Sequence, residues 1–94
     1  MTIDKTKENK MIHDLKILEE FANAVYSGDK NFEIRWNDRG FQKGDKVRFK
    51  VINDSGTSIK HDLEQETFVI TYVLSGWGIK NGYVVFGILN EIAL

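Results

Sequence analysis

The chain has 94 residues with no cysteine and no proline, and its 13 basic and 14 acidic side chains give a net charge of −1 at neutral pH. This length favours a single domain, and the lack of cysteine excludes disulfides, thiolate metal sites and thiol nucleophiles. The balanced charge excludes a histone-like protein that bulk charge holds on nucleic acid.

Residues 1–10 are polar and lack the apolar core of a signal peptide. The longest apolar runs are far shorter than the roughly 20 residues that span a bilayer. We therefore expect a flexible segment at residues 1–10, one domain at residues 11–94, a cytoplasmic location and no membrane partner.

The first predicted elements are a short strand and a helix. Residues 11–17 alternate weakly between apolar and polar, which favours a strand. From Leu18 to Tyr26 the apolar residues recur at helical spacing, and Gly28 follows where a left-handed residue ends a helix.

Two half-exposed strands are predicted next. In residues 30–36, Phe32, Ile34 and Trp36 share one face, which we expect to pack in the core. Residues 46–51 alternate in the same way. The polar stretch at residues 57–66 fits either a long loop or a weak edge strand.

The last predicted elements are strands at residues 67–74 and 83–89, both rich in β-branched and aromatic residues and expected to be central in a sheet. The glycine-rich link between them places Trp77 between two glycines, where we expect it to be exposed and free to stack on bases. A doubly wound sheet is excluded because it needs a crossover helix for each parallel pair. We predict an α+β fold: a small curved sheet or β-barrel of about five antiparallel strands, with one helix after the first strand.

The stretch most informative for function is residues 28–35, which places Lys30, Glu33 and Arg35 close together just after the helix. Such a cluster can hold a nucleobase, because a carboxylate accepts from exocyclic amines and a guanidinium donates to carbonyls. A structural Glu33–Arg35 ion pair at the helix–strand junction has the same spacing, and such pairs outnumber sites. We expect a partly hydrated Glu33, whose change to Gln would cost little stability.

These residues also carry a resemblance to a known family. Gly28-x-Lys30-x-x-Glu33-x-Arg35 after a short helix, followed by Lys43-Gly44-Asp45 before a strand, resembles the ASCH family of the PUA-like superfamily. Flanking motifs resemble a subfamily of short ASCH-like proteins common in phages and prophages: His13-Asp14-Leu15-Lys16, Arg35-Trp36-Asn37-Asp38-Arg39 and Gly82-Tyr83-Val84-Val85. The resemblance covers residues 13 to 89.

The resemblance implies a PUA-like (ASCH) β-barrel with a cleft beside the helix, a role in binding RNA or a nucleotide, and no cofactor. By position it places the Lys30, Glu33 and Arg35 cluster along the cleft. The other ligand-binding residues expected there are His13, Lys16, Asn37, Asp38 and Arg39.

One branch of that superfamily removes an acetyl group from acetylated cytidine, with a lysine at the position of Lys30 and a threonine nucleophile at that of Glu33. A carboxylate cannot take over this role, because its acyl intermediate would be an anhydride. We therefore expect binding rather than hydrolysis. Two alternatives stay open: a hydrolase of a modified nucleoside, and a phage accessory factor that binds protein through an exposed apolar patch.

Lys46, Arg48 and Lys50 form a basic ladder on one strand face, which fits contacts to phosphates and equally a plain solvated face. The only imidazoles are His13 and His61, too few for a metal site without carboxylate partners, and we expect no metal. The sequence does not determine the oligomeric state.

Overall fold

The computed structural model describes residues 10–94. Its elements in chain order are β1 (Ile12–Leu18), α1 (Glu19–Ser27), β2 (Phe32–Trp36), β3 (Lys46–Ile52), the 3₁₀ turn η1 (Asp62–Gln65), β4 (Thr67–Leu74), β5 (Tyr83–Asn90) and the 3₁₀ turn η2 (Glu91–Ala93). The α+β class, the five strands and the helix after the first strand are confirmed. The flexible segment predicted at residues 1–10 lies, except for Lys10, outside the described residues.

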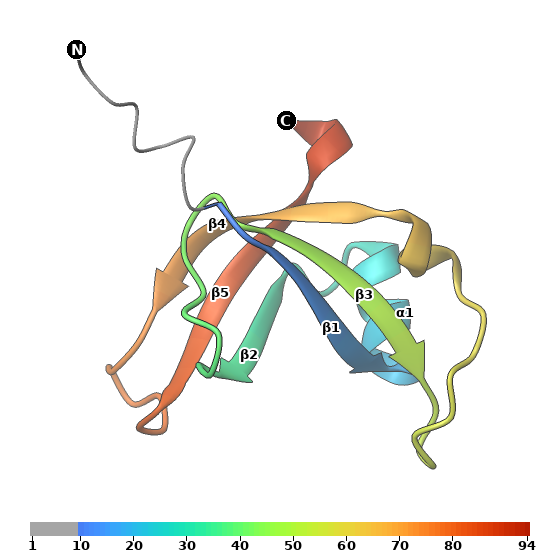
Figure 1. Cartoon of the computed structure of the whole chain (residues 1–94), viewed down its shortest axis with the longest axis horizontal. Helices are drawn as coiled ribbons and strands as arrows, with labels where there is room; N and C mark the ends of the chain where they lie inside the picture. The colour runs from blue at the N-terminus through green and yellow to red at the C-terminus, as the bar shows by residue number, and fades with distance from the viewer. Residues whose placement is uncertain (1–9) are drawn as a thin grey trace.

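The five strands form one curled sheet in the order β1-β3-β4-β5-β2, which makes a half-barrel (Figure 1). All neighbouring strands are antiparallel except β1 and β3, which run parallel. The expectation of antiparallel strands throughout is therefore wrong for this pair. Helix α1 and strand β2 lie between β1 and β3 in the sequence, and this long connection allows β3 to return beside β1 in the same direction.

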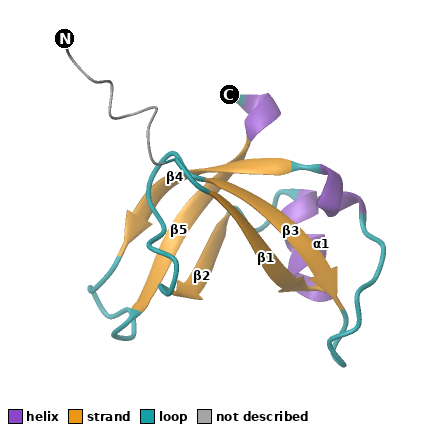
Figure 2. Ribbon diagram, viewed as in Figure 1, coloured by secondary structure: helices purple, strands orange, loops and turns teal. Residues whose placement is uncertain are grey.

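The curled sheet is barrel-like, as predicted, but it does not close. Strands β1 and β2 are the two ends of the sheet and share no ladder. We call the gap between these edge strands the seam. Helix α1 and η1 lie on the same side of the sheet (Figure 2), where α1 packs against η1, β1 and β3.

Helix α1 forms and ends as its sequence indicates. Glu19 and Glu20 occupy its first turn, where the helix dipole favours carboxylates. Gly28 takes a left-handed conformation with φ of 87° and donates its N–H to the carbonyl of Val25 at 3.1 Å. Only Ala22 and Val25 of this helix are buried.

The core lies on the concave side of the sheet. Strands β1 and β3 alternate between buried and exposed residues, as their sequences predict. The stretch left open at residues 57–66 is a loop that makes one bridge, between Ile52 and Ser58, and then forms η1. Its buried Leu63 joins a core of apolar residues: Leu15, Ile17, Ala22, Val25, Phe41, Val47, Phe49, Val51, Phe68, Ile70, Val84, Phe86 and Ile88.

Strand β2 presents the opposite face to the one expected. Phe32, Ile34 and Trp36 are exposed, and the intervening Glu33 is only 3% exposed. Trp36 lies on the outer side against Tyr83, with ring centroids 5.5 Å apart. Alternation assigns these residues to one face but does not say which face turns inward, and the inward face of this strand belongs to a charged network.

Strands β4 and β5 are central in the sheet, as predicted, and Trp77 in their connection is 91% exposed, also as predicted. Trp77 has a φ of 55°, which side-chain-bearing residues rarely adopt. None of the helices within residues 10–94 is long and apolar enough to cross a membrane.

Candidate functional site

Arginine side chains bridge the seam. Arg35 Nη2 donates to the carbonyl of Lys16 at 2.7 Å, and Arg39 Nη1 donates to the carbonyl of Asp14 at 2.7 Å. Because alternate residues of a strand direct their backbone groups to opposite edges, these two carbonyls belong to the edge of β1 that faces away from β3. The two arginines therefore hold the edge strands together at side-chain length.

A cavity of about 680 Å³ lies at this seam, between α1, the end of β1 and β2. Its apolar lining comes from Ile17, Leu18, Phe21, Ala24, Phe32 and Ile34. Its charged lining comes from Lys16, Asp29, Lys30, Glu33 and Arg35, which is three cations against two carboxylates. We call it the seam cavity; a concave, mainly apolar pocket with a few fixed polar groups is the usual form of a small-molecule site.

The buried carboxylate of Glu33 holds two of these cations. Its Oε2 accepts from Lys30 Nζ, and its Oε1 accepts from Arg35 Nε at 3.0 Å and from Arg35 Nη2 at 2.7 Å. Lys30 Nζ also donates to the carbonyl of Phe32 at 2.9 Å. The ion pair at the helix–strand junction is therefore present, and it lines the cavity as well. The expectation of a partly hydrated Glu33 is wrong, because the residue is buried and its carboxylate accepts three hydrogen bonds from its own two cations.

The cluster keeps donors for a ligand. Arg35 Nη1 and the third N–H of Lys30 have no acceptor among the described residues. The ammonium of Lys30 also lies 5.2 Å from the ring centroid of Phe32 and 5.7 Å from that of Phe21. This arrangement suits a ring that carries acceptor oxygens, since the cluster offers only donors and keeps one net positive charge.

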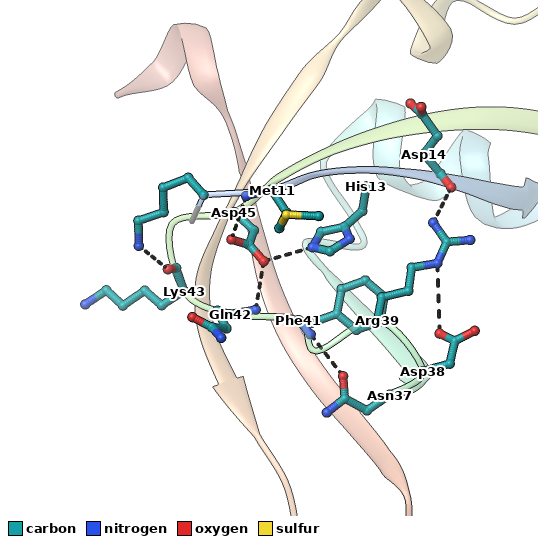
Figure 3. Close-up of polar contacts among 11 residues, drawn as sticks. Met11, His13, Asp14, Asn37, Asp38, Arg39, Phe41, Gln42, Lys43 and Asp45 are labelled. Carbon is teal, nitrogen blue, oxygen red and sulfur yellow. Dashed lines mark hydrogen bonds and ion pairs between the residues drawn. The ribbon is translucent and has the colours of Figure 1, made fainter. Parts of the chain in front are cut away.

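His13 lies in the core and does not line the cavity (Figure 3). Its Nε2 is 2.8 Å from Oδ2 of Asp45, which is 1% exposed. Because a carboxylate only accepts, Nε2 carries the proton of this hydrogen bond. Asp45 also accepts from the backbone N–H groups of Met11 and Gln42, at 3.2 and 3.1 Å. The pair fixes the loop before β3 to β1.

The predicted turn residues lie at the other end of the seam. Asn37 Oδ1 accepts from the N–H of Phe41 at 3.0 Å and so stabilises the turn. Arg39 Nε lies 3.9 Å from Oδ1 of Asp38 (Figure 3). Both residues border a small hollow of about 170 Å³, which Arg35 also lines. The structure therefore brings Asp38 and Arg39 next to the cluster, and Asn37 supports them.

A family model described as "Domain of unknown function (DUF3850)" matches residues 12–88 of the chain. The chain belongs to the DUF3850 family. The matched span contains β1 to β4 with α1 and most of β5, and therefore the whole seam cavity. No curated protein matches the chain.

The basic ladder of this DUF3850 protein is partly neutralised. Lys46 Nζ lies 2.8 Å from a carboxylate oxygen of Glu91, and Arg48 donates to both carboxylate oxygens of Asp14, at 2.9 and 3.2 Å. The hydrogen bond from Arg48 lowers the pKa of Asp14, and the same contact raises the pKa of Arg48. Only Lys50 of the three ladder cations has no ion pair within the described part of the chain.

Sequence reasoning missed the apolar lining of the DUF3850 site. The sequence pattern predicts only that Phe21 lies on the apolar face of the helix and that Phe32 and Ile34 pack in the core, whereas all three residues line the cavity. No local signal separates an edge strand from a central one here, because β2 alternates like any half-buried strand. Among residues 10–94, no group of three His, Cys, Asp or Glu side chains is placed to hold a metal ion.

Proposed function

We propose that this DUF3850 protein binds RNA or a nucleotide, with a base in the seam cavity. The observation that carries the proposal is the buried Glu33, which fixes Lys30 and Arg35 at the cavity while leaving each of them an N–H to donate. A cation fixed by a buried carboxylate is already oriented, so a ligand need not order it on binding.

A nucleobase fits the chemistry of this cavity. Its ring would contact Phe21 and Phe32, and base–aromatic contacts contribute about 1–3 kcal/mol per base. A carbonyl or ring nitrogen of the base would accept from Arg35, and a hydrogen bond to a charged group contributes about 1.5–3 kcal/mol. The volume of about 680 Å³ falls within the usual range for small-molecule sites.

Hydrolysis of a modified nucleoside receives no support from the cavity. None of its lining residues carries a hydroxyl or thiol. The carboxylate of Glu33 is occupied by two cations, and the ammonium of Lys30 is bound to two oxygens. Neither of these two groups is free to act as a nucleophile or as its base. The remaining carboxylate of the lining, Asp29, has no hydroxyl or thiol among the lining residues to activate, so we propose binding without turnover.

The test is an NMR titration with the four common nucleosides, their 5′-monophosphates and short mixed RNA oligomers. We expect backbone amide signals of residues 29–36 to shift, and Lys30→Gln to weaken binding about tenfold through the loss of one charged donor. Lys60→Gln removes the same charge on a distant loop and is the matched control. The proposal is overturned if no compound of the panel shifts these signals.

A second candidate, protein binding, is favoured by the outer face of β2, β5 and β4. Register partners there form rows without any charged residue: Trp36–Tyr83, Ile34–Val85–Leu74 and Phe32–Gly87–Tyr72. Tyr72 is 65% exposed, and Trp36 is 57% exposed. A contiguous uncharged face fits an equally uncharged surface, such as that of a second copy. Sedimentation velocity tests this: association must occur and must be lost in Tyr72→Glu, and a monomer at high concentration removes the candidate.

A further inference from the structure

Lys16 and Lys50 place two like charges side by side next to the seam cavity. They are register partners on the parallel strands β1 and β3, and both are exposed. Like charges directly opposite each other destabilise a sheet. Two residues earlier on each strand, Asp14 and Arg48 are also register partners, and there the opposite charges form two hydrogen bonds.

Neither lysine of this pair belongs to an ion pair within residues 10–94. Asp14, which lies two residues before Lys16 on the same face of β1, is already engaged by Arg48, and the hydrogen bond between them lowers the pKa of Asp14. The N–H donors of the two lysines therefore have no carboxylate partner among residues 10–94. An anion placed between them would remove the repulsion.

The lysine pair borders a defined hollow. Its volume is about 420 Å³, and its lining consists of Asp14, Leu15, Lys16, Phe49 and Lys50. The side chains of Leu15 and Phe49 lie in the core, so these two residues contribute their backbone as the floor. Of the charged side chains that line the hollow, Asp14 is held by Arg48, and the two lysines have no ion pair among residues 10–94. The charge of the hollow therefore favours an anion.

Lys16 links this hollow to the seam cavity, because it lines both. Its side chain belongs to the outer face, where it faces Lys50. Its carbonyl lies at the seam, where it accepts from Arg35 at 2.7 Å. A ligand whose ring occupies the seam cavity therefore lies next to Lys16, which also borders the hollow of the lysine pair.

We propose that Lys16 and Lys50 bind a phosphate of the same ligand, so that the protein takes a phosphorylated nucleoside and not the free nucleoside. This inference rests on the proposed function. Phosphate oxygens accept charge-assisted hydrogen bonds from two ammonium groups at once. A nucleotide monoester and an RNA phosphodiester share this chemistry, and both are arms of the test.

The experiment compares wild type, Lys16→Gln/Lys50→Gln and the charge-matched control Lys43→Gln/Lys60→Gln. Each is titrated by NMR with a nucleoside, its 5′-monophosphate, the corresponding dinucleoside monophosphate and inorganic phosphate. We expect one of the two phosphorylated ligands to bind wild type and control about tenfold more tightly than the nucleoside. In Lys16→Gln/Lys50→Gln this advantage, taken as the ratio of the two affinities within that variant, should fall below about twofold.

The outcomes separate the two proposals. If neither phosphorylated ligand binds more tightly, or if the advantage persists in Lys16→Gln/Lys50→Gln, the phosphate site is overturned and nucleoside binding still supports the seam cavity. If inorganic phosphate shifts signals at the two lysines but no nucleoside or nucleotide reaches the cavity, the lysine pair binds an anion, but the proposed function and the shared ligand are both overturned. If nothing binds, both fail.

Folding does not obscure this test. Removing one or both like charges should leave the melting temperature equal or higher, because the repulsion is relieved. A lower melting temperature in Lys16→Gln/Lys50→Gln than in the control would show that these side chains stabilise the sheet, and would count against a pair kept for a ligand.

Discussion

Removal of the charge of Glu33 tests the centre of the site most directly. Glu33→Gln keeps one neutral oxygen for Arg35 but turns an amide N–H group towards Lys30, so that donor faces donor. Breaking a buried ion pair on one side costs about 3–5 kcal/mol when the other charge stays buried. The side chains of Lys30 and Arg35 are 17% and 25% exposed, so water compensates part of this loss. We expect a cost of about 2–3 kcal/mol.

For a chain of this length, each kcal/mol lowers the melting temperature by about 4–8 °C, so Glu33→Gln should melt roughly 10–20 °C below wild type. Circular dichroism on heating and urea unfolding measure it. The matched control is Glu20→Gln, which removes a carboxylate from the exposed face of α1 and should change the free energy of unfolding by less than about 0.5 kcal/mol.

A double-mutant cycle shows whether the cost comes from the stranded cation. Lys30→Met removes that cation, so Lys30→Met/Glu33→Gln should be more stable than Glu33→Gln alone. If Glu33→Gln melts within about 2 °C of wild type, the carboxylate does not anchor the two cations, and the reasoning that places it at the centre of the site is refuted.

Three further predictions concern other parts of the chain. Gly82→Ala should lower the free energy of unfolding in urea by about 1–3 kcal/mol, because its Cβ would lie 2.2 Å from the ring of Trp36 at a φ of 88°. Gly56→Ala, with a φ of 82° and nothing within 4 Å, measures the cost of the backbone conformation alone. Equal decreases in the two variants would refute the contact with Trp36. The pKa of Asp14 should rise in Arg48→Gln, as followed by NMR of the side-chain carboxyl. Because folding lowers this pKa, the Asp14–Arg48 pair stabilises the folded protein at pH values above the ordinary aspartate pKa, and this stabilisation is lost as the pH falls through the lowered pKa of Asp14. An unchanged pKa of Asp14 in Arg48→Gln would contradict the contact. Acetylcytidine should remain intact on long incubation with the protein, as chromatography would show, and clear turnover would overturn binding without hydrolysis.

Several features of this chain follow from its sequence alone. Gly28 ends α1 because a left-handed residue is needed there, and the alternation in β1 and β3 reflects a sheet with one buried side. The exposure of Trp77 between two glycines is equally local. Such features depend on a few neighbouring residues, so the sequence alone predicts them.

The site depended on tertiary structure. Alternation places Glu33 and Trp36 on opposite faces of β2, but only the position of this strand at the seam decides that the carboxylate turns inward and the indole outward. The pairing of Lys16 with Lys50 requires β1 and β3 to be parallel neighbours in one register, although 27 residues lie between the end of β1 and the start of β3. Burial and charge pairing are properties of residues brought together from distant segments, and local periodicity does not contain that information.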